Sequence, residues 1–437
     1  MNEKIAALRK FAGHVTVRNA AMLYGVQLST YIFPLITLPY LTRVLSPDKF
    51  GLIGFALNFV WYFNTLTEYG FNLTATRRIA IAKDDPERVS AIFNSVMAAK
   101  TMLTVLGFIV MMVIVFATPK LRANWVLFPI SFLTVVGGLL FPTWLYQGVE
   151  KMGHVAARDF AAKLISTVLV FVLVRRESDF LLAAAIQPAA MTIAGAVSLL
   201  LAPRVCGVRF AMPPWTSIVA MMREGWPVFL SMAALAMTSS TNIVVLGFVT
   251  TDAQVGYYMA SYRLIVALRM LVVPIVTALY PHISHMAAKS EENAMRFLRR
   301  YALYLAAPFV FGSLLLIVLA PWVVRILFGP QYGETVLLLR LMALTPALLA
   351  ISHTYSTYYM LAFGYEKQWS RIVLQYTALN YILMACLLWW MKPTVAMALI
   401  GTLLDSFSVV ASYWFYRRNT RRGGIPDGSA AASGRLA

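Results

Sequence analysis

The stretch FGLIGFALNFVWYFNTLTEYGFNLTAT, residues 50–76, is long and apolar enough to cross a membrane, yet it carries a regular polar stripe. Asn64, Glu68 and Asn72 recur every four residues, which predicts one continuous face of a helix. A charged group at membrane depth costs ~2.5–3.5 kcal/mol on insertion scales, so it usually faces a protein interior or a watery cavity. The stripe therefore predicts a membrane helix with one face turned inward.

The whole chain has the composition of a protein whose main solvent is lipid. Of its 437 residues, 60% are hydrophobic and 13% are charged, and the mean hydropathy is +0.71. A soluble domain is about half apolar and a quarter charged. The first apolar run is longer than a signal-peptide core and lacks a small-residue cleavage site, so we interpret it as a retained span.

Twelve apolar segments reach the ~20 residues that cross a hydrocarbon core. They are expected at 20–42, 50–76, 91–117, 123–147, 155–174, 180–202, 225–249, 255–286, 297–320, 335–363, 369–391 and 394–416. The termini and even-numbered links hold 25 Lys and Arg, whereas the odd-numbered links hold eight. This bias places both termini in the cytoplasm. It also accounts for the net charge of +19 without a nucleic-acid partner, because the cations do not gather on one patch.

Two short motifs recur in the second half of the chain. The turn LSPDKFG (45–51) corresponds to TTDAQVG (250–256), and Gly51 and Gly256 are 205 residues apart. QGVEK (147–151) corresponds to FGYEK (363–367), after the fourth and tenth spans. An even number of spans in each half gives both halves the same orientation, so the repeat is parallel.

The fold class predicted from these patterns is an all-α polytopic membrane protein. Twelve transmembrane helices form two six-helix lobes, related by the parallel repeat, around a central cavity. The predicted N-terminal lobe is 1–205 and the C-terminal lobe is 206–420. Residues 421–437 are small and polar and predict a disordered cytoplasmic tail.

Polar and charged residues inside spans of both halves are the candidates for this water-accessible cavity. The candidate substrate-cavity residues are Gln27, Tyr31, Asn64, Asn72, Lys100, Tyr258, Tyr262, Arg263, Arg269 and Arg340. The candidates for coupling to H+ or Na+ are Glu68, Asp405 and His353. A carboxyl buried in a membrane takes up a proton more readily than one in water.

Structural roles for the same residues stay open. Arg263 and Arg340 lie within about two turns of an outer end and would reach the headgroups. Glu68 would pair with a basic residue and lock two helices together. His353 would be a hydrogen-bonded packing histidine rather than a proton relay.

The sequence lacks the motifs that are typical of nucleotide binding and metal binding. The sequence contains neither a GxxxxGK[ST] phosphate-binding loop nor an HExxH metal motif, so no cofactor and no metal site is predicted. Cys206 and Cys386 form no metal or disulfide pattern and are expected to be small apolar fillers. The outward links are too short for glycosyl-transfer chemistry, which disfavours an enzyme.

The region 18–78 is similar to the Wzx-type polysaccharide flippases of the multidrug/oligosaccharidyl-lipid/polysaccharide exporter superfamily. The resemblance lies in the proline-bearing first span, in RVLSPDKFG (43–51) and in YGFNLTATRR (69–78). LYQGVEKM (145–152) also resembles this family. The likeness is clear over the first ~160 residues and continues mainly through span number and length.

The resemblance implies a bacterial inner-membrane protein that translocates undecaprenyl-diphosphate-linked oligosaccharide repeat units for O-antigen or related surface polysaccharide. It implies a lipid-linked oligosaccharide, membrane lipid and other polysaccharide-assembly proteins as partners. Alternating access would move the head group, with or without coupling to an ion. Two alternatives are a multidrug or cation antiporter of the same superfamily and a membrane-embedded polysaccharide polymerase or ligase.

Overall fold

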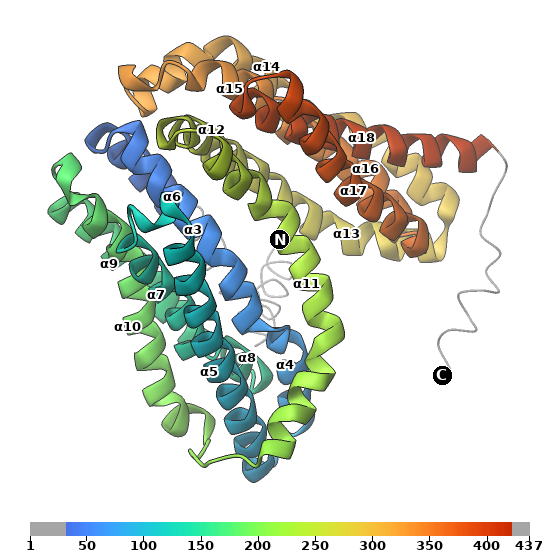
Figure 1. Cartoon of the computed structure of the whole chain (residues 1–437). Helices are drawn as coiled ribbons and strands as arrows, with labels where there is room; N and C mark the ends of the chain where they lie inside the picture. Colours follow the sequence, from blue (N-terminus) through green and yellow to red (C-terminus); the bar gives the residue numbers. More distant parts are fainter. Residues whose placement is uncertain (1–31, 422–437) are drawn as a thin grey trace, which may run out of the picture. The chain divides into compact units, whose positions relative to one another are not determined.

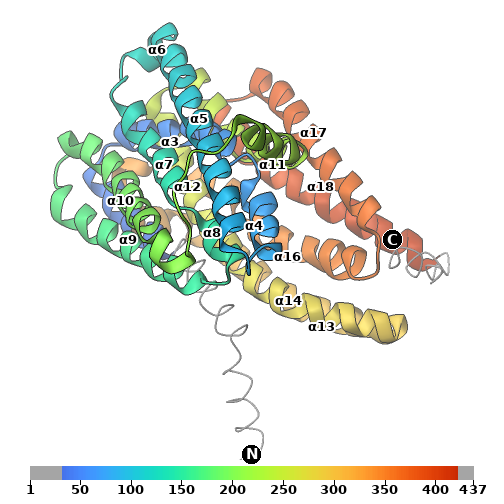
Figure 2. The same cartoon turned by 90° about the horizontal axis from the view of Figure 1, so that it is seen from below.

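The computed structural model describes residues 32–421, with the side chains of 235, 238, 239, 291, 299, 301–303 and 421 left out. Within that range every regular element is a helix, which confirms the predicted all-α membrane fold class (Figures 1 and 2). The chain divides into two compact units, unit 1 (Met1–Gly256) and unit 2 (Tyr257–Ala437).

Unit 1 holds the helices drawn from blue to green in Figure 1. They are the helix Ile32–Val44, α3 (Pro47–Glu68), α4 (Phe71–Ile81), α5 (Pro86–Ala117), α6 (Pro119–Arg122), α7 (Leu127–Leu140), α8 (Thr143–Gly148), α9 (Met152–Leu173), the 3-10 turn η1 (Glu177–Asp179), α10 (Phe180–Cys206), α11 (Trp215–Val249) and the start of α12 (Asp252–Met270).

Unit 2 contains the rest of α12 and eight further elements, the last of which is α18. They are α13 (Val272–Lys289), α14 (Glu291–Leu327), the 3-10 turn η2 (Pro330–Tyr332), α15 (Thr335–Met342), α16 (Thr345–Tyr355), the π-helix η3 (Ser356–Leu361), α17 (Glu366–Trp390) and α18 (Pro393–Arg421). The last two, α17 and α18, pack side by side in both views (Figures 1 and 2).

The length and apolar character of the helices indicate a multi-pass membrane protein. Among residues 32–421, nine helices or helix runs are long and apolar enough to cross a membrane. Within this range each of the twelve predicted segments is mostly helical, although several consist of two or more shorter helices. Three of the helices that match predicted segments are not among the nine: Ile32–Val44, α9 and α11. The described part of Ile32–Val44 is short, and α9 carries Arg158, Asp159 and Lys163. The multi-pass architecture is confirmed, and the number twelve stays a prediction.

Local chemistry fixes where the long helices of unit 1 begin. Ser46 caps α3, accepting a hydrogen bond from the Lys49 amide, and Pro47 occupies the first turn. Asp85 caps α5 in the same way, accepting from the amides of Glu87 and Arg88. Such caps satisfy amides that have no partner within the helix.

The predicted continuous helix over residues 50–76 is broken after Glu68. Tyr69 and Gly70 both have left-handed backbones, with φ of 46° and 78°. Two features require glycine at position 70. Its left-handed backbone disfavours other residues, and a Cβ there would lie 2.6 Å from Cγ1 of Val228 on α11. The expectation of one unbroken helical face was therefore wrong, because the chain turns at Tyr69–Gly70 and begins α4.

The two copies of the repeated turn motif meet in unit 1. A Cβ built on Gly51 would lie 1.9 Å from the Asp252 carbonyl oxygen, and one on Gly256 would lie 2.1 Å from the Pro47 carbonyl oxygen. Adding 205 converts Pro47 into Asp252 and Gly51 into Gly256, so the contact is reciprocal. Glycine at both positions lets the starts of α3 and α12 touch through their backbones.

Packing of α11 determines the extent of unit 1. This helix packs along α3 and also contacts α5 and α4, so the compact unit extends to Gly256. The predicted lobes 1–205 and 206–420 follow the sequence repeat instead, and that division stays a prediction. The predicted tail, 421–437, lies outside the described residues apart from Arg421.

Candidate functional site

Lys100 on α5 is the centre of a buried polar cluster in unit 1. Its ammonium donates to Glu68 Oε1 at 2.9 Å and to the Gly138 carbonyl oxygen on α7 at 3.2 Å. The Lys100 side chain is only 1% exposed, whereas that of Glu68 is 25% exposed. The cation is thus enclosed by three helices and its carboxylate partner is the more accessible member.

The polar stripe of the sequence completes this cluster. Asn72 Nδ2 donates to Glu68 Oε2 at 2.8 Å, so the stripe stays connected across the break at Tyr69–Gly70. A Cβ on Gly138 would lie 3.2 Å from Asn64 Oδ1 and 3.4 Å from Glu68 Oε1. The absence of a side chain at Gly138 therefore lets its backbone carbonyl reach Lys100 beside the stripe.

A second charge pair lies in unit 2, between α12 and α18. Arg269 Nη1 lies 2.6 Å from Asp405 Oδ2, and Arg269 Nη2 lies 3.5 Å from Asp405 Oδ1. The Tyr376 hydroxyl on α17 donates to Asp405 Oδ1 at 3.4 Å. Here the carboxylate is the enclosed member, with 4% exposure against 26% for the guanidinium.

Two predicted aromatic residues accompany this pair on α12. The rings of Tyr258 and Tyr262 stack with centroids 5.8 Å apart and planes 11° apart. Tyr258 is buried, and Tyr262 and Arg263 are partly buried. Stacked aromatic pairs of this kind contribute to packing, and a buried tyrosine hydroxyl usually finds a hydrogen-bond partner.

His353 lies at the start of a helix irregularity in unit 2. Its Nδ1 is 2.8 Å from Thr357 Oγ1, and the chain passes from α16 into the π-helix η3 between these residues. At the preceding residue, the Ser352 hydroxyl lies 2.8 Å from the Ser408 hydroxyl and joins α16 to α18. Single π-helical turns are frequent at functional sites, although they also occur elsewhere.

Arg340 has a local structural partner. Its Nε donates to the Ile317 carbonyl oxygen at 3.1 Å. Pro321, four residues later within α14, has no amide to satisfy that carbonyl. The side chain of Arg340 therefore supplies the hydrogen bond that the proline removes.

The structure brings the predicted residues together as two groups. Asn64, Glu68, Asn72 and Lys100 meet in unit 1, whereas Arg269 and Asp405 meet in unit 2. Gln27 and Tyr31 lie outside the described residues, and a central cavity stays a prediction. Sequence reasoning missed Tyr376, although Tyr376 and Asn380 form a helically spaced polar pair within a predicted span.

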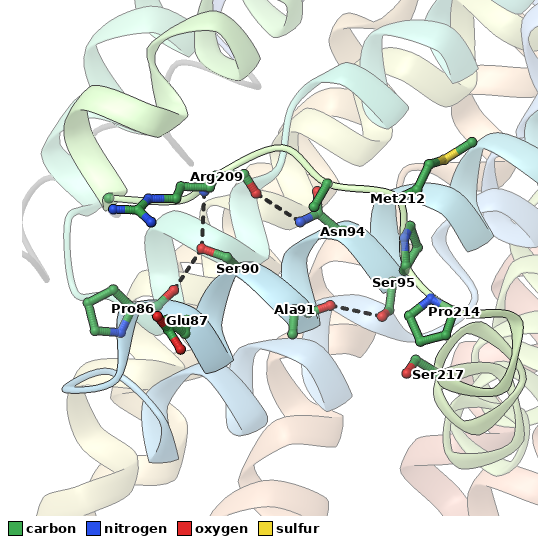
Figure 3. A pocket seen from close by; sticks show the side chains of 13 residues that line it. Pro86, Glu87, Ser90, Ala91, Asn94, Ser95, Arg209, Met212, Pro214 and Ser217 are labelled. Atoms are coloured by element: carbon green, nitrogen blue, oxygen red, sulfur yellow. Dashed lines mark hydrogen bonds between the residues drawn. The ribbon is translucent and has the colours of Figure 1, made fainter.

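Unit 1 also contains a pocket of about 560 Å³ that no predicted site residue lines. The link between α10 and α11 arches over the first turns of α5, as Figure 3 shows. The Arg209 amide donates to Ser90 Oγ at 3.1 Å, and Asn94 Nδ2 donates to the Arg209 carbonyl at 2.8 Å. These bonds hold the link in place, and Met212 at its tip is 97% exposed.

A family model described as "Polysaccharide biosynthesis protein" matches residues 16–287. The chain belongs to this family. Two relatives have the name "Putative O-antigen transporter". The one from Escherichia coli (strain K12) is 31% identical over 84% of this chain and 88% of its own length. The one from Shigella dysenteriae is 30% identical over 81% of this chain and 88% of its own length.

Solved structures place this polysaccharide biosynthesis protein in a known transporter fold. The lipid II flippase MurJ, in an inward closed conformation, has a TM-score of 0.66 at 11% identity and covers 92% of this chain and 87% of its own. An inward-facing multidrug resistance MATE transporter of the MOP superfamily has a TM-score of 0.58 at 13% identity, covering 95% and 100%. The resemblance to exporters inferred from the sequence is confirmed, and the family is one of transporters rather than enzymes.

Proposed function

We propose that this protein translocates an oligosaccharide repeat unit linked to undecaprenyl diphosphate across the bacterial inner membrane, for O-antigen or related surface polysaccharide. The family membership and the names of its relatives support a lipid-linked saccharide as substrate. The observation that carries the proposal is the buried Lys100–Glu68 pair in a membrane-spanning helix bundle. It provides a cation for a diphosphate and an exchangeable anion beside it.

The exposure of the two partners determines how a diphosphate would use this pair. Lys100 is enclosed, whereas Glu68 and Asn72 are accessible. An arriving phosphate oxygen would replace the Glu68 carboxylate beside the ammonium, so the buried cation would keep an anionic partner throughout. Charge-assisted hydrogen bonds of this kind are stronger than bonds between neutral groups. The Asn64 and Asn72 amides would hydrogen-bond sugar hydroxyls.

The pair in unit 2 has the opposite arrangement. Asp405 is enclosed and the guanidinium of Arg269 is the accessible partner, so a phosphate would bind Arg269 directly without displacing Asp405. Arginine presents donors in a planar fork that matches phosphate oxygens. Tyr262, on the same helix, would add an aromatic surface for a sugar ring. Arg263 and Arg340 are assigned weaker, accessory roles along the path.

Coupling to H+ or Na+ is a further part of the proposal. Protonation of Glu68 would remove its attraction for Lys100 and leave the ammonium ready for a diphosphate. Asp405 and His353 are the corresponding candidates in unit 2. Rocking between inward-open and outward-open states would then carry the head group across while the polyprenyl chain stays in the bilayer. The termini would lie in the cytoplasm, and other polysaccharide-assembly proteins would receive the product.

The experiment that tests this function follows the lipid-linked intermediate. Deletion of the gene should cause undecaprenyl-diphosphate-linked repeat units to accumulate inside the cell and surface polysaccharide to disappear, and the wild-type gene should reverse both. Export of cationic dyes without any change in lipid-linked saccharide would support the antiporter alternative instead. For the coupling role, Glu68→Gln and Asp405→Asn should abolish complementation at normal protein levels. Full complementation by both variants would remove that role.

A further inference from the structure

An apolar groove lies between α9 and α10 of unit 1, which run side by side in Figures 1 and 2. It has a volume of about 380 Å³ and is lined by Arg158 and twelve apolar residues. Six of these are alanines, which leave a trough where larger side chains would fill the space. They are Ala161, Ala162, Ala185, Ala189, Ala190 and Ala194.

The length of the groove matches a hydrocarbon chain of one leaflet. Along α9 the lining positions run from Arg158 to Leu169, which is about 17 Å at the helical rise per residue. Half of a bilayer's hydrocarbon core is about 15 Å thick. A single acyl chain lying along the groove would therefore start near Arg158 and end close to the bilayer midplane.

Arg158 presents a positive charge at one end of this groove. Its Nη1 donates to the Tyr146 hydroxyl at 3.0 Å and to Ser198 Oγ at 2.9 Å, and its guanidinium lies 5.3 Å from the Tyr146 ring centroid. These partners are neutral, so they orient the guanidinium without cancelling its charge. Among residues 32–421 no carboxylate is within ion-pair distance of it.

A second cation lies at the same end. Lys151 precedes α9, is exposed, and donates from Nζ to the Val205 carbonyl near the end of α10. Two carboxylates lie nearby in the sequence, and both already form ion pairs: Asp159 with Lys163, and Glu150 with Lys83. Two cations whose neighbouring carboxylates pair with other residues favour an anionic ligand over a zwitterionic one.

We propose that this groove binds one anionic phospholipid, with an acyl chain along the alanines and the phosphate on Arg158 and Lys151. This inference does not depend on the transport proposal. Charge argues against two other occupants. The segment 1–31 carries Glu3 as its one carboxylate beside four Lys and Arg, and a second copy of the chain would bring the same cations. A polyprenyl chain is much longer than the groove.

Native mass spectrometry of the purified full chain tests this site. The protein is stripped of lipid in mild detergent and titrated with phosphatidylglycerol or phosphatidylcholine of the same chain length. Wild type should retain one phosphatidylglycerol in preference to phosphatidylcholine. Arg158→Gln should weaken that binding roughly tenfold, because it removes the charge that the phosphate would bind. Arg158→Lys, which keeps the charge, should lose less.

Two further variants separate binding from folding. Ala189→Leu fills the groove without touching Arg158, and it should also abolish the bound lipid while the protein elutes as wild type in size-exclusion chromatography. Arg175→Gln, just beyond the other end of α9, is the matched control and should bind phosphatidylglycerol normally. Equal binding of both lipids, no effect of Ala189→Leu, or a co-purified polyprenyl lipid at this position would overturn the proposal. A disulfide from Ala189→Cys to a cysteine placed within 1–31 would overturn it as well.

Discussion

The ammonium of Lys100 lies 2.9 Å from the carboxylate of Glu68 and joins α5 to the last residue of α3. Removing one member of a buried ion pair leaves an uncompensated charge and destabilises a protein by about 3–5 kcal/mol, whereas replacing both members is often neutral. Stability and transport at this pair are therefore separable by mutation.

The first prediction concerns the stability of this pair. Lys100→Met should lower the apparent melting temperature in detergent, because it leaves Glu68 beside an apolar side chain. Adding Glu68→Gln should restore most of the loss. Fluorescence-detected size-exclusion chromatography after heating measures both. A double variant no more stable than Lys100→Met would show that the two residues are not coupled.

The second prediction concerns the stability of the contact between Gly51 and Gly256. Alanine at either position would place a methyl group within about 2 Å of a backbone carbonyl oxygen, at Asp252 or Pro47 respectively. We expect each variant to lose about 1–3 kcal/mol or more, as for overpacked cores. Gly312 is the control, because a Cβ there meets no atom within 4 Å. Alanine at Gly312 should be neutral or stabilising by roughly 0.5–1 kcal/mol, and equal thermal shifts at all three glycines would contradict the close approach.

The Arg269–Asp405 pair should tolerate exchange better than loss. Asp405→Asn leaves the partly exposed Arg269 guanidinium without its anionic partner and should reduce both protein yield and transport. The exchange Arg269→Asp with Asp405→Arg keeps the pair and should recover folding, measured as monodisperse protein after purification. If the exchanged variant gave no more monodisperse protein than Asp405→Asn, a stabilising ion pair at this position would be contradicted.

Arg340 and Pro321 form a further testable pair. Arg340→Gln removes the donor to the Ile317 carbonyl and should destabilise unit 2 by about 0.5–1.5 kcal/mol, the net contribution of one hydrogen bond. Pro321→Ala restores the helical amide, so Arg340→Gln should have less effect in that background. A double-mutant cycle of melting temperatures measures the coupling. Additive effects would mean that Arg340 does not replace the missing helical bond.

The sequence predicts more of the fold than of the candidate site. Apolar runs fixed the positions of the helices, because lipid requires every backbone polar group to be bonded within a helix. The break at Tyr69–Gly70 was missed, although glycine after a helical run is a recognised end signal. The apolar pattern continues across it, so hydrophobicity alone does not reveal the turn.

The sequence names Glu68, Lys100, Arg269 and Asp405 as candidate site residues, but it does not show that they form two ion pairs. Residues 32 positions apart, such as Glu68 and Lys100, meet only because α3 and α5 pack together, and spacing carries no information on that contact. The Gly138 carbonyl was also beyond prediction, since a backbone acceptor leaves no mark in a sequence. By contrast, the sequence repeat alone indicates the two turn motifs whose glycines meet in the structure.

Translocation by the purified protein tests the central claim most directly. Liposomes containing wild type, Lys100→Arg, the Glu68→Gln/Lys100→Met double variant or the Gly312→Ala control would receive a short-chain undecaprenyl-diphosphate oligosaccharide on one side, and its appearance on the other side would be measured. Wild type, the glycine control and, more slowly, Lys100→Arg should transport, whereas the stable double variant should show at least a tenfold lower rate, the effect of about 1.4 kcal/mol. Transport by the double variant at the wild-type rate would contradict a role for Lys100 in binding the diphosphate.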